Sequence, residues 1–197
     1  MRLNRLQKAL WIAAILALGA FAAAQLVGPR QPAEETAESF RPAFSLPDGA
    51  GRLRDNAEFR GRWLLVFFGF SNCPDICPTT LAEVARVMDG LGADAEKVQP
   101  LFISIDPERD RLLGIDDFTG AFHPSILGLA GDAAQTSAAA KSFHIFYERE
   151  DDEAAPDGYT MSHSQGLFLI GPDGEWLRQY AYGMPAAEIL TDLKERI

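Results

Sequence analysis

Cys73 and Cys77 are the only two cysteines among the 197 residues of this chain. Three residues separate them, one more than in the ordinary dithiol motif CxxC. If the segment from Cys73 onward forms a helix, this spacing places both sulfurs on one helix face, with the Cβ atoms about 5–6 Å apart. The two sulfurs would then share one metal ion or one covalent bond.

The sequence around the cysteines favours reactive thiols. An apolar run over residues 63–70 precedes them and predicts a buried strand, and residues 79–91 predict an amphipathic helix after them. The thiols therefore lie between the carboxyl end of a strand and the amino end of a helix, where α/β proteins gather functional groups. A helix N-terminus stabilises a thiolate and lowers the thiol pKa. The polar and proline-rich neighbours of the cysteines argue against two buried, inert thiols.

Two kinds of chemistry suit such a pair, soft-metal ligation and thiol–disulfide exchange. Two sulfurs alone leave zinc or an iron–sulfur cluster without enough ligands. Copper fits better, because two thiolates and one imidazole form a trigonal site for copper(I) and, with an added ligand, for copper(II). A metal site of this kind therefore requires a histidine from elsewhere in the chain.

Three histidines are candidates for the third ligand: His123, His144 and His163. His163 immediately precedes a predicted strand, and the small polar residues around it suit a projecting loop. His123 precedes a proline in a predicted loop and His144 ends a predicted helix, so a surface or packing role is favoured for both. Spacing alone makes His163 a candidate and does not select it.

The N-terminus predicts a membrane segment. Arg2, Arg5 and Lys8 precede an apolar run over residues 9–27. As a helix this run would span about 28 Å, close to the roughly 30 Å hydrocarbon core of a bilayer. Residues 1–27 are therefore predicted to be a membrane anchor or uncleaved signal, although small residues near the end of the run would also suit signal cleavage. The preceding cations predict that this end stays in the cytoplasm and that the rest lies outside it.

The remaining chain is acidic. Four of the 18 basic side chains lie in the first 32 residues, which leaves 14 against 28 acidic side chains. This balance excludes nucleic acid as an expected partner. Residues 28–40 are polar and rich in proline and glutamate, which predicts a linker, and residues 41–197 are predicted to form one domain. A Cys73–Cys77 disulfide would close a very short loop and constrain the unfolded chain little, so added stability does not explain why the pair is present.

Helix and strand signals alternate within the predicted domain, which indicates an α/β fold with a central mixed sheet. Predicted strands cover residues 63–70, 98–105, 126–130, 145–149, 166–170 and 175–182, and predicted helices cover residues 79–91, 114–122, 132–143 and 185–196. Asp132 is predicted to cap the helix that begins there. The acidic segment 148–157 is predicted to be a solvated loop.

Three motifs together resemble the Sco/SenC proteins, the copper chaperones of cytochrome c oxidase assembly. They are Asn72-Cys73-Pro74-Asp75-Ile76-Cys77-Pro78, Asp106-Pro107-Glu108-Arg109-Asp110 after a strand, and His163-Ser164 before another. The resemblance implies a thioredoxin-like fold with an N-terminal transmembrane helix. It also implies that copper, as Cu(I) and Cu(II), is bound by Cys73, Cys77 and His163.

The same resemblance implies a function and a location. The expected function is a metallochaperone, with no turnover of its own, that delivers copper to the binuclear copper site on cytochrome c oxidase subunit 2. The expected location is the bacterial inner membrane, with a single pass through residues 9–27 and the soluble domain in the periplasm. A thiol–disulfide oxidoreductase stays open as the alternative, with Cys73 as nucleophile and Cys77 as resolving thiol, reducing the cysteines of that site or of another partner.

The chain departs from the family pattern after the acidic motif. The family often continues with Thr-Pro, whereas Arg111 and Leu112 follow Asp110 here. Asp106 and Arg109 are interpreted as turn and salt-bridge residues at a helix entry, with partner docking as the alternative. The isolated methionines near His163 and in the last loop are expected to pack rather than to bind copper.

Overall fold

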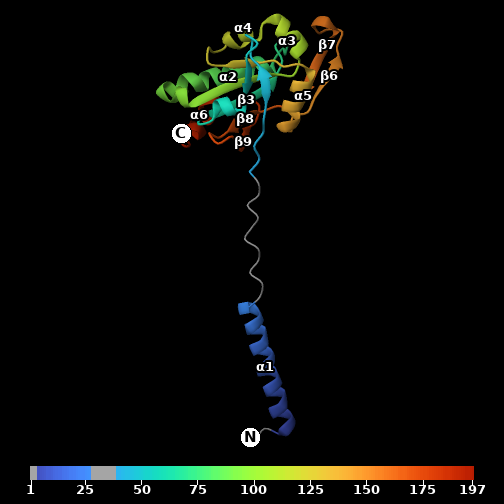
Figure 1. The fold of residues 1–197 in the computed structure, drawn as a ribbon, viewed down its shortest axis with the longest axis vertical. Coiled ribbons are helices and arrows are strands. Elements are labelled where there is room, and N and C mark those ends of the chain that lie inside the picture. Colours follow the sequence, from blue (N-terminus) through green and yellow to red (C-terminus); the bar gives the residue numbers. More distant parts are fainter. Residues whose placement is uncertain (1–3, 28–38) are drawn as a thin grey trace. The chain divides into compact units, whose positions relative to one another are not determined.

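The computed structural model describes residues 4–27 and 39–197, which fall into two units that divide after Ser39. The first unit contains helix α1, Arg5–Val27, and the second contains all the other elements (Figure 1). Most of the predicted linker falls on residues 28–38, which lie outside the described residues. Each unit is therefore described by itself.

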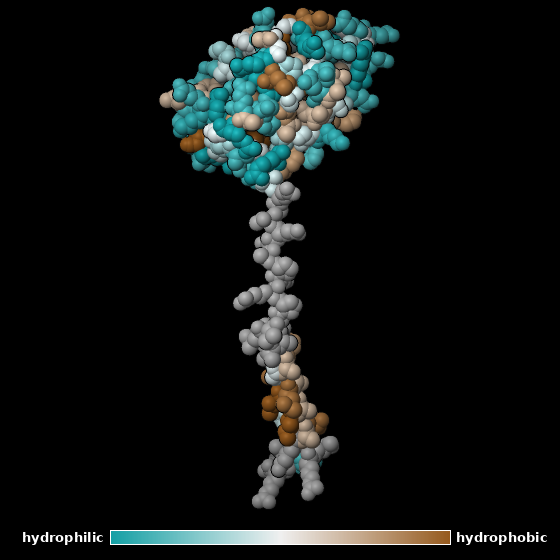
Figure 2. All heavy atoms as spheres, viewed as in Figure 1, coloured by the Kyte–Doolittle hydropathy of each residue, from teal (hydrophilic) through white to brown (hydrophobic). Residues whose placement is uncertain are grey.

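Helix α1 covers the apolar run of the N-terminus, and apolar side chains such as Leu10, Trp11 and Ile15 are exposed along it. Figure 2 shows this apolar surface in brown, in contrast to the mostly hydrophilic visible face of the second unit. Within the described residues, no helix reaches the combination of length and hydropathy that marks a bilayer-spanning segment.

The second unit contains nine strands, five α-helices and three short 3₁₀ helices among the described residues. In chain order they are β1 (Ser45–Pro47), β2 (Leu53–Asp55), η1 (Asn56–Phe59), β3 (Trp63–Gly69), α2 (Ile76–Leu91), η2 (Gly92–Lys97), β4 (Val98–Ser104), α3 (Pro107–Leu113), α4 (Ile115–Gly120), β5 (Leu127–Leu129), α5 (Ala133–Ser142), β6 (Tyr147–Asp151), η3 (Pro156–Gly158), β7 (Tyr159–His163), β8 (Leu167–Ile170), β9 (Trp176–Tyr180) and α6 (Ala186–Lys194).

The five-stranded sheet has the order β5-β4-β3-β8-β9. Strands β3, β4 and β5 are parallel, whereas β8 is antiparallel to both β3 and β9. Phe67 of β3 lies opposite Phe102 of β4 and opposite Leu167 of β8. The predicted α/β class with a central mixed sheet is thereby confirmed.

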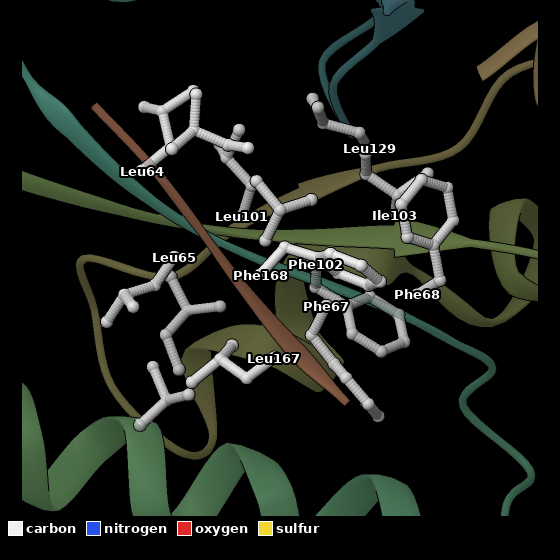
Figure 3. Close-up of a cluster of buried hydrophobic side chains, with 14 of the residues drawn as sticks. Leu64, Leu65, Phe67, Phe68, Leu101, Phe102, Ile103, Leu129, Leu167 and Phe168 are labelled. Carbon is white, nitrogen blue, oxygen red and sulfur yellow. The ribbon is translucent and has the colours of Figure 1, made fainter. Parts of the chain in front are cut away.

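The core lies on both faces of this sheet, because β3 is apolar at nearly every position and alternate side chains point to opposite faces. Leu65 and Leu167 lie on the face that helix α2 covers, and Leu64 and Leu129 lie on the other face (Figure 3). Phe68 packs on this second face against Phe143, which follows α5, with ring centroids 5.1 Å apart. Both faces of the sheet are thus buried.

The structure corrects two predictions about helices. Helix α2 begins at Ile76, three residues before the predicted start, because Pro78 lies in its first turn, where proline is tolerated. Helix α3 was not predicted, because its seven residues end in the exposed Leu112 and Leu113 and present no clean apolar stripe. The predicted cap of α5 is confirmed, since the Asp132 carboxylate accepts from the N–H of Gln135 at 2.8 Å.

The prediction of a solvated loop over residues 148–157 is wrong for residues 148–151, which belong to β6. Most of β6 and the turn that leads to β7 occupy this segment, with Glu148 opposite Ser162 and Asp151 opposite Tyr159. An antiparallel pair satisfies the backbone hydrogen bonds while its charged side chains stay in water, so acidic composition does not prevent the strand. This hairpin β6–β7 carries His163 at the end of β7.

Candidate metal centre

The two cysteines lie side by side at the carboxyl end of β3. Cys73 occupies a turn in which its N–H donates to the carbonyl of Phe70 at 3.3 Å, and Cys77 lies in the first turn of α2. The two cysteines therefore do not lie on one helix, although their spacing had suggested that they would. The Cys73 sulfur still lies beside Cys77, because the N–H of Cys77 donates to it at 3.3 Å.

The two sulfurs have opposite acid–base character. The Cys77 thiol and the backbone N–H groups of Cys77, Asp75 and Ile76 stabilise the Cys73 thiolate, which lowers the pKa of Cys73 to about 5. The same hydrogen bond, together with burial, raises the pKa of Cys77 far above its ordinary value. At neutral pH the pair is thus one half-buried thiolate and one buried thiol.

The floor of the site is the end of β3. A Cβ atom added to Gly69 would lie 2.8 Å from Cys77 Sγ, 2.9 Å from the Phe102 ring and 3.0 Å from the Phe67 ring. Only a glycine allows the Cys77 sulfur to approach the strand this closely. The Phe67 ring therefore lies beside the buried sulfur.

His163 comes to the same neighbourhood from the hairpin β6–β7. Its imidazole packs edge-on against Phe67 and Phe70, with ring centroids 6.1 and 6.2 Å apart. Nδ1 lies 2.9 Å from the carbonyl oxygen of Ser164, which can only accept, so Nδ1 carries the proton. This bond leaves the lone pair on Nε2, the arrangement in which a histidine ligates a metal through Nε2.

The structure brings only part of the predicted ligand set together. No group of three or more His, Cys, Asp and Glu side chains within the described residues meets the geometry of a metal site. Cys73 and Cys77 are in contact, while His163 and the Cys77 sulfur both lie near Phe67. The role of His163 as a ligand stays a prediction.

The other two histidines have different surroundings. His123 Nδ1 lies 2.7 Å from Ser125 Oγ, and its Nε2 lies 3.6 Å from an Asp89 carboxylate oxygen. His144 has a positive φ of 55° and stacks on Phe40, with ring centroids 4.8 Å apart. These local contacts agree with the packing and surface roles expected for both.

Helix α3 supports the cysteine turn. Asp110 is fully buried, and its carboxylate accepts from the N–H of Ser71 at 3.0 Å and from the Ser104 hydroxyl at 2.6 Å. Burial raises the pKa of Asp110, and this carboxyl in turn contributes to raising the pKa of Cys77. In the sequence, Asp110 belongs to a motif that predicts no role for it, and its spacing of four from Asp106 after a strand is the available signal.

Asp106 and Arg109 form the expected ion pair, with 3.0 Å between Arg109 Nε and an Asp106 carboxylate oxygen. Both side chains are 7% exposed, so they are buried rather than presented as a docking surface. They hold Tyr159 of β7, a contact that sequence analysis missed because 50 residues separate Arg109 from Tyr159.

The chain resembles known proteins over most of its length. A family model described as SCO1/SenC matches residues 32–197. The protein named SCO2 homolog, mitochondrial, from Bos taurus is 35% identical over 187 residues, which cover 91% of this chain and 70% of that protein. The human protein named SCO1 homolog, mitochondrial, is 34% identical over 155 residues, which cover 76% of this chain and 50% of that protein.

Solved structures agree with this relationship. The structure of Bradyrhizobium japonicum ScoI with copper bound has a TM-score of 0.73 and 31% identity, and the match covers 81% of this chain and all of that one. The structure of yeast Sco1 with copper bound has a TM-score of 0.71 and 28% identity, over 80% of this chain and 88% of that one. The thiolate–thiol pair, the mixed sheet and these matches lead to one conclusion: the chain belongs to the SCO1/SenC family.

Proposed function

We propose that this protein is a copper metallochaperone, with Cys73, Cys77 and His163 as the ligands of the copper that it carries. The observation that carries the proposal is the contact between a Cys73 thiolate and the Cys77 thiol, at the strand end where the imidazole of His163 also packs. Soft thiolates and an imidazole suit Cu(I), and Cu(II) with an added ligand. Relatives solved with copper bound support the choice of metal.

Closure of the site requires the His163 side chain or the cysteine turn to move, because the three side chains do not yet meet the geometry of a metal site. His163 is held by one backbone hydrogen bond and by aromatic contacts, and Nε2 is free to ligate. Copper binding also releases the proton of Cys77, because a thiolate rather than a thiol binds the metal. The buried thiol becomes a ligand only after it has lost this proton.

Copper titration of the full chain tests the proposal. One equivalent of Cu(I) and one of Cu(II) are expected to bind the wild type. His163→Ala is expected to lower the affinity for Cu(II) by at least about tenfold, because mutation of a residue that only hydrogen-bonds to a metal ligand already costs that much. His123→Ala and His144→Ala are the matched controls, since both histidines have local contacts of their own. Equal Cu(II) affinity in all three variants would remove histidine from the site.

We propose further that the copper passes to a binuclear copper site of cytochrome c oxidase, on its second subunit. The membership of the SCO1/SenC family supports this acceptor. The test is transfer of Cu(I) from the loaded chain to the soluble copper domain of that subunit, followed by the spectrum of the binuclear site. A domain that acquires no copper from the wild-type chain contradicts the proposal.

A second function, reduction of a partner disulfide, is favoured by the low pKa of Cys73. The Cys73 thiolate would attack the partner disulfide and release one partner thiolate; Cys77, after losing its proton, would attack Cys73 Sγ and release the second. Two electrons pass to the partner, and the chain keeps the disulfide. Cys77→Ser is expected to trap the mixed disulfide, and His163→Ala is expected to leave this reaction unchanged while weakening Cu(II).

We propose that helix α1 anchors the protein in the bacterial inner membrane and that residues 41–197 face the periplasm. The apolar run over residues 9–27, behind Arg2, Arg5 and Lys8, supports both the anchor and its orientation. The full chain is expected to resist alkaline carbonate extraction, and a double substitution, Leu16→Arg with Leu18→Arg, is expected to release it. Protease added to intact spheroplasts is expected to digest the domain; protection of the domain contradicts the orientation.

A further inference from the structure

Helix α3 is bonded to both parts of the candidate metal centre. On one side, its Asp110 carboxylate accepts from the N–H and the hydroxyl of Ser71, two residues before Cys73. On the other side, its N-cap residue Asp106 and its Arg109 bond to Tyr159, at the start of the strand that ends in His163. One short helix thus contacts the cysteine turn and the histidine strand through different side chains.

Tyr159 is held from several directions. Its hydroxyl lies 3.1 Å from both carboxylate oxygens of Asp106, to which it donates, and it accepts from Arg109 Nε at 3.0 Å. The guanidinium carbons of Arg109 and Arg149 lie 3.8 and 3.6 Å from the centroid of its ring. Asp157 adds a carboxylate 3.8 Å from Arg109 Nε. A buried tyrosine with its hydroxyl bonded and with two guanidinium groups against its ring has little freedom to move.

Tyr159 and His163 are the two ends of the same strand. They are four residues apart on β7, so a period of two places them on one face, about 13 Å apart along the strand. The strand is paired with β6 over its whole length, from Asp151 opposite Tyr159 to Tyr147 opposite His163. A rigid paired strand transmits the position of one end to the other.

We propose that Tyr159 is a positioning residue for His163, and that helix α3 sets the separation between the imidazole and the two cysteines. The inference rests on the proposed function for its consequence in copper binding, but the position of the imidazole is a property of the metal-free protein. The cysteine turn is bonded through Asp110 instead, so loss of the Tyr159 hydroxyl acts on the histidine and not on the sulfurs.

The test compares Tyr159→Phe with Tyr147→Phe in the full chain. Both changes remove one phenol hydroxyl from the same hairpin, and the Tyr147 hydroxyl makes no hydrogen bond to any residue that the structure describes. The first readout is the NMR signals of the His163 ring protons in metal-free protein, which the rings of Phe67 and Phe70 shift according to their distance. Tyr159→Phe is expected to move these signals several-fold more than Tyr147→Phe.

Two further measurements separate positioning from stability. Tyr159→Phe is expected to weaken Cu(II) binding by less than the roughly tenfold that follows loss of a direct partner of a ligand, and to leave the reduction potential of the Cys73–Cys77 pair unchanged. Lower stability with unmoved His163 signals would overturn the proposal. A wild type that binds no copper would instead remove the proposed function, and the His163 signals would still decide on positioning.

If Tyr159→Phe does not fold, Arg149→Gln replaces it. Arg149 is exposed and contributes only the outer guanidinium of the stack, so the hydroxyl bonds to Asp106 and Arg109 remain. The His163 signals are expected to move in this variant by less than a full loss of the hydroxyl would cause. Unchanged signals in a folded Arg149→Gln chain count against the proposal.

Discussion

The backbone N–H of Cys77 donates to the sulfur of Cys73 across 3.3 Å. Cys77 is the second residue of helix α2, and the N-cap residue Asp75 makes no capping hydrogen bond with its own side chain. The Cys73 sulfur therefore performs the task of an N-cap, which is to accept from an otherwise unbonded N–H of the first turn. Capping by a thiolate places negative charge at the positive end of the helix, where it is stabilised.

This arrangement predicts how the reactivity of Cys73 depends on pH. The alkylation rate of Cys73 is expected to rise through about pH 5 and then to level off, because the pKa of Cys73 is lowered to that value. Cys77→Ala removes the thiol that contributes most to this lowering, so the midpoint is expected to move up. Iodoacetamide labelling at a series of pH values, read by mass spectrometry, measures both midpoints.

The control for this experiment is Cys73→Ala. Cys77 is fully buried in the native chain, so it is expected to stay unmodified without denaturant. An unchanged midpoint in Cys77→Ala would show that a hydrogen bond from the Cys77 thiol does not determine the pKa of Cys73.

Gly69→Ala is expected to destabilise the fold. The added Cβ would lie within 3.0 Å of Cys77 Sγ and of two aromatic rings in the core, and overpacking of this kind costs about 1–3 kcal/mol. Gly120→Ala is the matched control, because nothing lies within 4 Å of its added Cβ, and it is expected to change stability by no more than about 0.5 kcal/mol. Urea unfolding of both variants measures the difference, and equal midpoints would contradict the close approach of the sulfur to β3.

Asp110→Asn is expected to change how stability depends on pH. Burial raises the pKa of Asp110 above its usual 3.8, so the native chain binds this proton more tightly than the unfolded chain. The resulting stabilisation is present below pH 3.8 and is lost as pH rises through the native pKa. The free energy of unfolding of the wild type, relative to Asp110→Asn, should therefore fall over this window, as urea titrations at stepped pH would measure. A constant difference would contradict the prediction.

Asp192→Asn is expected to show the opposite sign. Hydrogen bonds from Arg196 and Tyr180 lower the pKa of Asp192 to about 2, so its stabilisation is present above pH 3.8 and is lost as pH falls toward 2. Thermal unfolding at stepped acidic pH is expected to show the wild type losing its advantage over the variant. An advantage that persists at the lowest pH would mean that the pairing does not hold in solution.

The sheet and the cysteine turn could be predicted from sequence because their signals are local. The apolar run before Cys73 predicts β3 to within one residue, and Asp132 predicts the start of α5. The strand predicted over residues 145–149 overlaps the first half of β6. Strand β7 and the pairing of the hairpin could not be predicted, because acidic residues are typical of loops and strand pairing depends on the partner rather than on composition. The position of α2 was missed by three residues because proline at a third helical position leaves no distinctive signal.

The candidate site could be predicted only in part for the same reason. Two cysteines at a strand end are visible in sequence, and the family resemblance adds His163. The bonds from helix α3 to Ser71 and Tyr159 join residues 39 to 53 positions apart, and no periodicity encodes contacts of that kind. Such support becomes visible only when the fold brings the segments together.

The placement of β8 next to β3 also determines how late in synthesis β3 gains its second neighbouring strand. The ribosome makes β3, α2 and β4 well before β8, so β3 is at first an edge strand with an almost wholly apolar sequence. Exposed apolar edges pair readily with other chains, which makes the unfinished protein prone to aggregation. Both thiols emerge in that period, whereas His163 arrives with the hairpin just before β8. Protection of the growing chain from oxidation and self-association therefore matters most before β8 is made.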